Sequence, residues 1–296
     1  MNKELVKEFH NFVRGEIIPN ESLSKHTSFK IGGPADAWVY PKDISDIKNI
    51  LMFCNSRSIP VTILGGGTNV LISDKGIRGV ILNLKHELCS IRIKSDSVIC
   101  GAGALLSRVL KQVVKAELTG LEFTAGIPGT IGGAVSMNAG AIGDLVESVK
   151  VIDMNGNVSE LGKDDLRFGY RKSNLSEYII VEVKLKLKSG NEKEINDRIS
   201  MFWEHKKSTQ VLDIPSAGCI FKNPDGHSAG RLIDEAGLKG LAIGDAQVSD
   251  KHANFIINNG NAKGQDVLEL IKKIKLTVFE KIGVKLEEEV KIIGMQ

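Results

Sequence analysis

Apolar and polar residues alternate with a period of two in several short runs, which predicts β-strands. The strictest alternation lies in residues 178–190, YIIVEVKLKLKSG, and predicts a half-exposed strand. Residues 149–161 predict a hairpin, because two apolar runs flank Asn155-Gly156, a pair that accommodates positive φ. Further strands are predicted at ADAWVY (35–40), VTIL (61–64), GVILNL (79–84), SIRIKSDSVIC (90–100), NFIIN (254–258) and EEEVKIIG (287–294).

Other segments place apolar residues three and four positions apart, which predicts helices with one buried face. An amphipathic helix is predicted at the N-terminus, where the apolar residues with this spacing are Leu5, Phe9, Phe12 and Ile17. Further helices are predicted at 104–117, 191–210, 228–240 and 264–283. The last two end at glycine, a frequent helix terminator. Strands and helices mix without a strict βαβ alternation, so we expect an α+β fold with a boundary near residues 190–210.

Composition and charge exclude some functions. The net charge of +3, from 39 basic and 36 acidic residues, is too small to predict a nucleic-acid partner. The N-terminal segment carries acidic residues and no apolar run of signal-peptide length. No stretch approaches the roughly 18 apolar residues of a membrane span. We therefore expect a cytoplasmic protein without a membrane partner, and a monomer.

The four cysteines do not predict a disulfide framework or a zinc site. Cys54, Cys89, Cys100 and Cys219 form no C-x-x-C pair and lie near no paired histidines. Disulfides are rare in the reducing cytosol. Taken alone, Cys219 in PSAGCIFKNP is most simply a small buried apolar residue, the usual role of a free cysteine.

Two glycine-rich segments are candidates for ligand binding. In LGGGTNVLISDKG (64–76), three glycines follow a predicted strand, so exposed backbone N–H groups can form an anion nest for a pyrophosphate. Val70 stands where a Rossmann fingerprint needs its third glycine, and the chain has no P-loop motif. In AGIPGTIGGAVSMNAGAIG (125–143), the glycine density suits a flat ligand lying along the backbone. The alternative is that both segments are tight turns with no ligand.

Six motifs together carry a resemblance to a known family. They are HTSFKIGGPAD (26–36), LGGGTNVLISD (64–74), AGIPGTIGGAVSMNAGA (125–141), FGYRKS (168–173), AGCIFKNP (217–224) and LEEEVKIIG (286–294). In this order they resemble the UDP-N-acetylenolpyruvoylglucosamine reductases, bacterial flavoenzymes of cell-wall synthesis, over about residues 20–294. The short segment between Arg171 and Cys219 resembles the subtype without a tyrosine lid.

The resemblance implies a domain organisation. It implies a two-lobed FAD-binding domain of the vanillyl-alcohol-oxidase type and a smaller α+β substrate domain. The first lobe would comprise residues 1–83, joined by a C-terminal strand within 284–296. The second lobe would comprise 84–205, and the substrate domain 206–283.

The resemblance also implies noncovalent FAD, with NADPH as the reductant. The residues that would hold the FAD pyrophosphate are Gly65, Gly66, Gly67, Thr68, Asn69, Val70 and Leu71. Those that would line the isoalloxazine and ribityl chain are Ile127, Pro128, Gly129, Gly133, Ala134, Asn138 and Gly140. For His26, in KHTS, we expect a structural or surface role rather than covalent flavin attachment.

The family reaction reduces UDP-N-acetylglucosamine enolpyruvate to UDP-N-acetylmuramate. Charge develops next to the substrate carboxylate, which calls for a fixed cation and for an acid that supplies a proton. The resemblance implies that Arg171 holds the carboxylate by two hydrogen bonds, that Glu289 stabilises charge, and that Cys219 replaces the family's usual serine as proton donor. A thiol, with an ordinary pKa near ~8.5, is mostly protonated at neutral pH.

Substrate contacts and competing functions complete the prediction. Candidate contacts to substrate are Tyr170, Lys222, Asn223, His252 and Asn254. If residues 219–223 run extended, Cys219, Phe221 and Asn223 share one face of the strand. Two alternatives remain: an FAD-dependent oxidase or dehydrogenase acting on an alcohol or hydroxy acid, and a nonenzymatic flavin- or nucleotide-sugar-binding module. The oxidase or dehydrogenase needs a catalytic base rather than an acid, and the binding module needs neither.

Overall fold

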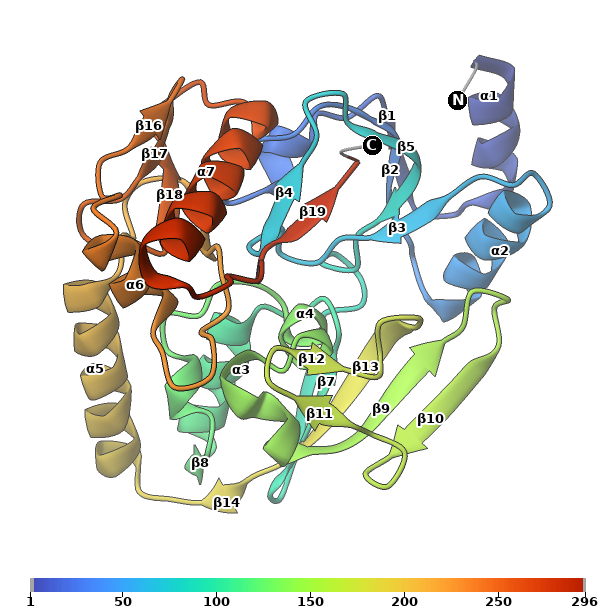
Figure 1. Cartoon of the computed structure of the whole chain (residues 1–296). Helices are drawn as coiled ribbons and strands as arrows, with labels where there is room; N and C mark the ends of the chain where they lie inside the picture. The colour runs from blue at the N-terminus through green and yellow to red at the C-terminus, as the bar shows by residue number, and fades with distance from the viewer. Residues whose placement is uncertain (1–2, 295–296) are drawn as a thin grey trace. The chain divides into compact units, whose positions relative to one another are not determined.

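The structure is a computed structural model that describes residues 3–294 and, in the first helix, side chains from residue 8 onward (Figure 1). Contacts divide the chain into two compact units. Unit 1 comprises the chain through Asn20 together with 36–66 and 79–205. Unit 2 comprises 21–35, 67–78 and the chain from Lys206 onward. Each unit is therefore assembled from segments that lie far apart in the sequence.

The first sheet of unit 1 has the strand order β1-β2-β5-β3. Its strands are β1 (Glu16–Pro19), β2 (Ala35–Tyr40), β3 (Val61–Ile63) and β5 (Ile77–Leu82). Helices α1 (Lys3–Phe12) and α2 (Ile44–Asn55) lie in the same unit and contact each other. Strands β3 and β5 pair in parallel, whereas β1 and β2 pair antiparallel.

The N-terminal helix is shorter than predicted. It ends at Phe12, and Ile17 lies in β1 rather than on the helix. The cause is Asp46, a fully buried carboxylate that accepts the backbone N–H groups of Arg14 and Gly15 at 2.9 Å each. These bonds fix the chain in a turn before β1. Phe9 is buried as predicted, Phe12 is 40% exposed, and the Leu5 side chain lies outside the described residues.

The second sheet of unit 1 is antiparallel, with the order β10-β9-β13-β7-β6. Its strands are β6 (Ile91–Lys94), β7 (Ser97–Gly101), β9 (Val146–Ile152), β10 (Val158–Gly162) and β13 (Ile179–Lys186). The predicted half-exposed strand is β13. That prediction is wrong for Ile179–Val181, three consecutive buried residues, because helix α4 packs against β13.

Shorter elements of unit 1 surround this sheet. The helices are α3 (Leu106–Lys115), α4 (Ile131–Ser136) and the 3-10 turns η2 (Glu122–Thr124) and η3 (Ala139–Leu145). Two small strand pairs are β8 (Leu118–Thr119) with β14 (Lys188–Ser189), and β11 (Phe168–Gly169) with β12 (Lys172–Ser173). Helix α5 (Glu192–Thr209) begins in unit 1 and ends after the division at residue 205. Figure 1 shows α4 beside β12 and β13, as their contacts require.

Unit 2 has an antiparallel sheet with the order β15-β18-β17-β16. Its strands are β15 (Ser216–Cys219), β16 (Ala242–Ile243), β17 (Ala246–Val248) and β18 (Phe255–Asn258). Helix α7 (Gly264–Ile282) contacts β16 and β17, and α6 (Ala229–Glu235) contacts α7 (Figure 1). The turn η1 (Leu23–His26) also belongs to this unit. Helix α7 ends as predicted at Gly283, whose φ of 81° favours glycine.

A parallel strand pair brings the C-terminal segment to the first glycine-rich segment. Strand β19 (Lys291–Ile293) pairs with β4 (Val70–Ile72), and both lie in unit 2 (Figure 1). The expected C-terminal strand is thus present but begins at Lys291. The division into two FAD lobes and a substrate domain stays a prediction, since the contact-based units follow different bounds.

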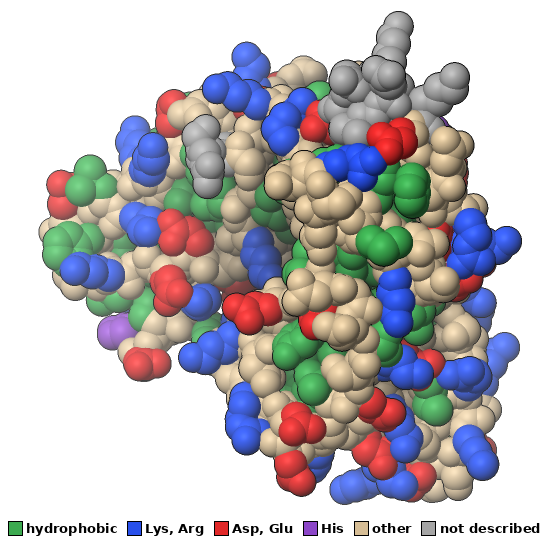
Figure 2. Space-filling view, turned by 90° about the vertical axis from the view of Figure 1, so that its right-hand side faces the viewer, with side chains coloured by type: hydrophobic (Ala, Val, Ile, Leu, Met, Phe, Trp, Pro, Cys, Tyr) green, Lys and Arg blue, Asp and Glu red, His purple; other side chains and the backbone are tan. Residues whose placement is uncertain are grey.

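Two properties of the described part of the chain bear on the excluded functions. Among residues 3–294, no helix is both long and apolar enough to cross a membrane. On the face seen in Figure 2, acidic and basic side chains are interspersed rather than gathered in a stripe.

Candidate functional site

The first glycine-rich segment begins with a loop whose carbonyl groups are held by a buried asparagine. Asn83 is 2% exposed, and its side-chain amide donates to the carbonyl oxygens of Leu64 at 2.7 Å and Gly65 at 2.9 Å. In a trans peptide the C=O and the following N–H point in opposite directions. The N–H groups of Gly65 and Gly66 are therefore directed away from Asn83, the arrangement that an anion nest requires.

The same loop meets the second glycine-rich segment at Thr130. A Cβ added to Gly65 would lie 2.7 Å from the Thr130 hydroxyl oxygen, so this position admits little more than glycine. Thr130 is the N-cap of α4, and its hydroxyl oxygen accepts the N–H of Gly133 at 3.3 Å. Gly65 and Thr130, 65 positions apart in sequence, thus make the two glycine-rich segments neighbours within unit 1.

In unit 2 the loop continues through Gly67 to Leu71. Gly67 has φ 65°, and a Cβ there would lie 2.0 Å from the backbone oxygen of His26. The N–H of Ser28 donates to the Gly67 oxygen at 2.9 Å. Nε2 of His26 shares a hydrogen bond with the Glu21 carboxylate at 2.9 Å, which fits the structural role expected for it. Val70 and Leu71 are buried in β4 and have a packing role in unit 2.

The second glycine-rich segment presents several residues at the surface of unit 1. Pro128, Gly133 and Gly140 are exposed, whereas Ala134 is buried. Gly140 has φ 59°, and a Cβ there would lie 2.6 Å from the ring of Phe123. The ring of Phe123 therefore leaves no room for a side chain at position 140.

Asn138 links this segment to the arginine motif. Its backbone is left-handed, with φ 49° and ψ 49°. Its side-chain oxygen accepts the N–H of Gly143 at 2.9 Å, and its amide donates to the carbonyl of Gly169 at 3.0 Å. Ser173 adds a second link, since its hydroxyl donates to the carbonyl of Ser136 at 2.7 Å. Asn138 and Ser173 thus fasten both strands of the β11–β12 hairpin to the second glycine-rich segment, 125–143, called the flavin segment below after the ligand that the resemblance implies for it.

Arg171 lies at the turn of that hairpin. Its φ of 55° is uncommon for a residue with a side chain, and such strain concentrates at functional positions. The side chain is half-buried, with its guanidinium 5.6 Å from the ring centre of Tyr170. Tyr170 is 55% exposed. Because both strands of the hairpin are tied to the flavin segment, the position of Arg171 is fixed relative to it.

Cys219 ends strand β15 in unit 2, just after a bulge. The register shifts between Ser216 and Cys219, and Gly218 has φ 76°. Cys219 is partly exposed and contacts the small apolar cluster of Val211, Phe255 and Ile257. A simple alternation beyond Cys219 is wrong, because consecutive Ile220 and Phe221 are both buried in the larger core of unit 2. The bulge and the turn of the chain after it cause this change.

Asn254 holds the residues that follow Cys219. It is 3% exposed, and its side chain accepts the Phe221 N–H at 2.9 Å and donates to the Phe221 carbonyl at 2.8 Å. Its own carbonyl accepts the N–H of Ile220 at 2.9 Å. These three bonds commit the Asn254 amide to the backbone, so its part in the site is to hold this segment.

The three consecutive acids differ in their surroundings. Glu287 pairs with Lys222 at 2.5 Å, and Glu288 pairs with Lys275 at 2.7 Å. The Glu289 backbone N–H donates to the carbonyl of Ile220 at 2.8 Å. The side chain of Asn69 donates to the Glu289 carbonyl at 3.1 Å. Glu289 is therefore held between the residue after Cys219 and the first glycine-rich loop, all within unit 2.

The remaining substrate candidates have mixed surroundings. Asn223 is exposed, and its side-chain oxygen accepts the N–H of Ala229 at the start of α6, at 2.9 Å. The ring of His252 packs against Phe255, and its Nδ1 is buried without a hydrogen-bond partner among the described residues. Burial lowers the pKa of His252, as does the charge of Lys239 nearby, so the neutral ring is favoured.

The predicted residues are divided between the two units. Unit 1 contains the following: Gly65, Gly66, Ile127, Pro128, Gly129, Gly133, Ala134, Asn138, Gly140, Tyr170 and Arg171. Unit 2 contains these: Gly67, Thr68, Asn69, Val70, Leu71, Cys219, Lys222, Asn223, His252, Asn254 and Glu289. Sequence reasoning missed Asn83, whose amide binds two loop carbonyls, because a single asparagine after a strand carries no distinctive pattern. Among residues 3–294, no group of three or more metal-ligating side chains is present.

The residues of unit 1 fit an extended flavin dinucleotide. Outward N–H groups at Gly65 and Gly66 suit a pyrophosphate, and a Cβ at Gly65 would fill the space beside Thr130. The exposed backbone around Gly133 and Gly140 provides a surface for a planar ring. The fit rests on backbone groups, which explains the glycine content of both segments.

Comparison with family models finds two matches that together span most of the chain. Residues 35–162 match an FAD binding domain. Residues 209–293 match the C-terminal domain of UDP-N-acetylenolpyruvoylglucosamine reductase. These matches confirm the predicted α+β organisation, with an FAD-binding part followed by a second domain.

Individual relatives agree with the family models. The chain is 46% identical to a UDP-N-acetylenolpyruvoylglucosamine reductase of Caldanaerobacter subterraneus subsp. tengcongensis, over 99% of the chain and 96% of the relative. It is 45% identical to the enzyme of that name from Clostridioides difficile, over 99% of each chain. The crystal structure of the reductase from Thermus caldophilus superposes with a TM-score of 0.81 at 38% identity, covering 95% of this chain and 99% of that one.

Proposed function

The chain belongs to the UDP-N-acetylenolpyruvoylglucosamine reductase family, and from this premise we infer that it reduces UDP-N-acetylglucosamine enolpyruvate to UDP-N-acetylmuramate. FAD is its cofactor and NADPH is the reductant. One observation of geometry supports this function above others: Asn138 and Ser173 tie the Arg171 hairpin to the flavin segment. A fixed cation beside a flavin is what reduction of a carboxylate-bearing enol ether requires.

The cofactor supplies the redox chemistry. When bound, FAD would supply the hydride chemistry, from NADPH as reductant to the methylene carbon of the enolpyruvyl ether as acceptor. We assign the pyrophosphate to the N–H groups of Gly65 and Gly66, which Asn83 directs outward. We assign the isoalloxazine to the segment from Ile127 to Gly140. No residue is assigned to a covalent bond with the flavin.

Arg171 holds and polarises the substrate in this proposal. Its guanidinium binds the enolpyruvyl carboxylate through two parallel hydrogen bonds, a geometry that lysine does not reproduce. Negative charge spreads onto that carboxylate when hydride reaches the neighbouring carbon. A cation that is already in position stabilises this charge without reorganising. Fastening the hairpin to α4 and η3 therefore serves catalysis.

Cys219 and Glu289 complete the proposed chemistry. The Cys219 thiol donates its proton to the carbon that carries the carboxylate, and the thiolate then regains a proton from solvent. Glu289 stabilises the same developing charge in its protonated form. The bond from Glu289 N–H to Ile220 supports this pairing, because it fixes the acid relative to the residue after Cys219.

A substrate-dependent assay tests the function. Purified protein should carry noncovalent flavin, which acid releases completely into the supernatant. It should oxidise NADPH only when UDP-N-acetylglucosamine enolpyruvate is present, with UDP-N-acetylmuramate as the product. UDP-N-acetylglucosamine, which lacks the enolpyruvyl group, is the matched control. Steady NADPH oxidation with that control, or flavin that stays with the precipitated chain, would contradict the assignment.

The proposal also covers the cellular location of the enzyme and its oligomeric state. UDP-linked precursors and NADPH are both cytoplasmic, so we place the enzyme there. We propose that it acts as a monomer. Sedimentation of the flavin-loaded protein tests this, since a mass well above 32.1 kDa would contradict it.

A further inference from the structure

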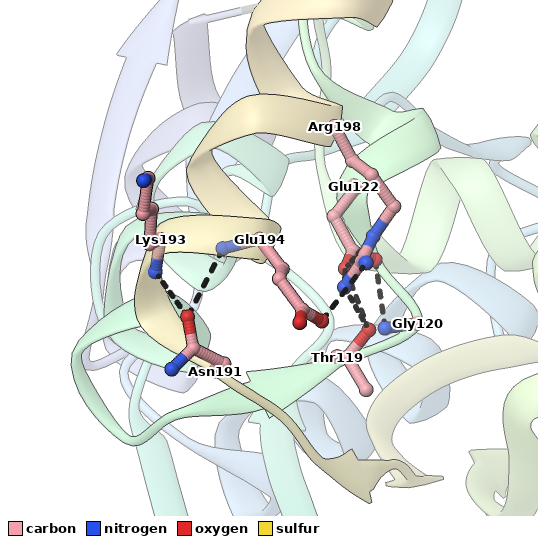
Figure 3. Close-up of polar contacts among 7 residues, drawn as sticks. All are labelled: Thr119, Gly120, Glu122, Asn191, Lys193, Glu194 and Arg198. Carbon is pink, nitrogen blue, oxygen red and sulfur yellow. Dashed lines mark hydrogen bonds and ion pairs between the residues drawn. The ribbon is translucent and has the colours of Figure 1, made fainter.

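A buried carboxylate lies at the start of the flavin segment. Glu122 is 5% exposed. Its carboxylate accepts hydrogen bonds from the Thr119 hydroxyl at 2.6 Å and from the Gly120 N–H at 2.7 Å. Arg198 donates to it through Nε at 3.0 Å and through Nη2 at 2.9 Å (Figure 3). A buried charge needs such partners, and losing one is costly.

Arg198 also holds Thr119. Its Nη2 donates to the Thr119 hydroxyl oxygen at 2.9 Å, and that hydroxyl in turn donates to Glu122 (Figure 3). The guanidinium therefore binds the carboxylate and one of the carboxylate's other partners at the same time. Lysine, with a single nitrogen on a flexible stem, does not hold both in this geometry.

Glu122 begins a short turn that leads directly into the flavin segment. It is the first residue of η2, and the carbonyl of Thr124 in that turn accepts the N–H of Ile127 at 2.9 Å. The next residue, Phe123, lies against Gly140, where a Cβ would come within 2.6 Å of the ring. Glu122 thus fixes the turn that positions Phe123 and Ile127, and both of these side chains lie beside Gly140 in the proposed isoalloxazine surface.

Arg198 reaches this turn from helix α5. Ile195 is the buried residue of α5, and the Arg198 side chain is 41% exposed. Arg198 also forms an exposed pair with Glu194, 3.8 Å away and one helical turn earlier (Figure 3). Two neighbours on α5 therefore provide controls. Substitution of Glu194 removes an exposed charge, and substitution of Ile195 removes buried packing.

We propose that Arg198 is a positioning residue for the flavin, acting through Glu122 on the turn that carries Phe123 and Ile127. This inference rests on the proposed function, because it assumes that the flavin binds the segment from Ile127 to Gly140. Arg198 itself does not touch the reacting atoms. It determines how firmly the isoalloxazine surface is held, and therefore flavin affinity and the electronic surroundings of the ring.

The experiment uses the full chain stripped of flavin and titrated with FAD. We measure the dissociation constant and the visible circular dichroism of the saturated protein, with thermal unfolding of each apoprotein alongside. The test variants are Arg198→Ala, Arg198→Lys and Glu122→Gln. The matched controls are Glu194→Gln, which removes the exposed partner of Arg198, and Ile195→Ala, which weakens the packing of α5.

The expected pattern separates positioning from general stability. Arg198→Ala and Glu122→Gln should weaken FAD binding by roughly tenfold or more, the usual size of coupling between linked groups, and should alter the flavin dichroism. Arg198→Lys should fall between Arg198→Ala and the parent. Glu194→Gln should match the parent. Ile195→Ala should melt earlier yet keep parental affinity and dichroism.

Other outcomes overturn the inference. Parental affinity and dichroism in Arg198→Ala would do so, as would equal changes in Ile195→Ala, which would reveal only loosened packing. If Arg198→Ala does not fold, Arg198→Lys is compared with Glu194→Gln. Weaker FAD binding in Arg198→Lys supports the inference, and equal binding in the two overturns it. Turnover and FAD binding by the parent are measured in the same series. Failure of the parent to bind FAD contradicts the proposed function, whereas an unaffected Arg198→Ala contradicts this inference alone.

Discussion

The side chain of Asn138 donates a hydrogen bond to the carbonyl of Gly169, 31 residues further along the chain, at 3.0 Å. This bond joins the flavin segment to the hairpin that carries Arg171. Two features of unit 1, the second glycine-rich segment and Arg171, are therefore fixed relative to each other before any substrate binds. Such preorganisation is how enzymes place charge without reorganising during the reaction.

Substitution of Asn138 should have two separable effects, one on substrate turnover and one on the free energy of unfolding. Asn138→Ala loses both hydrogen bonds and places alanine in a left-handed backbone, whereas Asn138→Gly loses the bonds but relieves the backbone. Both variants should lose substrate turnover, and the alanine variant should also unfold about 1 kcal/mol more easily than the glycine variant. Turnover and urea unfolding of the two proteins check this. Parental turnover in Asn138→Gly would show that the bond to Gly169 does not serve catalysis.

Arg171→Lys should keep the positive charge and lose the planar pair of donors. We expect turnover to fall by ~10²–10³, by analogy with removing one oxyanion-stabilising donor. Reduction of the bound flavin by NADPH should change far less, since it precedes the substrate carboxylate. Arg167→Lys is the matched control, because Arg167 lies four residues earlier and donates to the Leu166 carbonyl instead. Full turnover in Arg171→Lys would place the carboxylate clamp elsewhere.

The four thiols should differ sharply in reactivity. Burial raises the pKa of Cys54 and of Cys100 to about 12, and both side chains are fully buried. The thiolate is the reactive form, so these two should resist alkylation in the native protein at mildly alkaline pH. Cys89 and Cys219 are partly exposed and should react. Mass spectrometry should find two labels, and Cys219→Ser should remove one. Native labelling of Cys54 or Cys100 would contradict this burial.

A fall in pH should lower the stability of unit 1, because it protonates the Glu122 carboxylate. Burial raises the pKa of Glu122, but bonds from Thr119, from its own backbone, from Gly120 and from Arg198 outweigh this and lower it overall. A carboxylate with a depressed pKa contributes stability that is full above its unfolded pKa, near ~4.3, and is lost as pH falls through the folded value. Glu122→Gln should therefore be destabilised by about 1.5–3 kcal/mol at neutral pH, with the difference shrinking in acid.

Tryptophan fluorescence during urea unfolding measures this difference in the relevant unit, because Trp38 and Trp203 both lie in unit 1. Unfolding curves of the parent and Glu122→Gln are compared from neutral pH downward. Glu194→Gln serves as the control and should follow the parent throughout. A difference that stays constant or grows as the pH falls would contradict the assignment of a depressed pKa.

Much of the local structure could be predicted from the sequence, because it depends on neighbours in the chain. The alternation at 97–101 and the glycine after α7 report strand and helix ends directly. The prediction was wrong at Ile17 and at Ile179–Val181. There, distant partners decided the outcome: the carboxylate of Asp46 in one case, and helix α4 packed against the strand in the other.

The site could be predicted only in part, for a related reason. Motifs identified the glycine-rich segments, Arg171 and Cys219. The groups that hold them come from elsewhere: Asn83 is 18 residues from Gly65, and Arg198 is 76 residues from Glu122. A lone asparagine or arginine at such a distance has no periodic pattern. The pairing of β4 with β19, which joins residues 70–72 to residues 291–293 within unit 2, is equally nonlocal.

The central claim is that Cys219 acts only after the flavin is reduced, as the proton donor to substrate. Stopped-flow absorbance separates the two half-reactions in the parent, Cys219→Ala, Cys219→Ser and a control, Cys89→Ala, which removes the other partly exposed thiol. Flavin reduction by NADPH should be nearly equal in all four proteins. Reoxidation by UDP-N-acetylglucosamine enolpyruvate should slow by ~10²–10⁴ in Cys219→Ala alone, with Cys219→Ser retaining much of the rate. Equal reoxidation rates in the parent and Cys219→Ala would contradict the account.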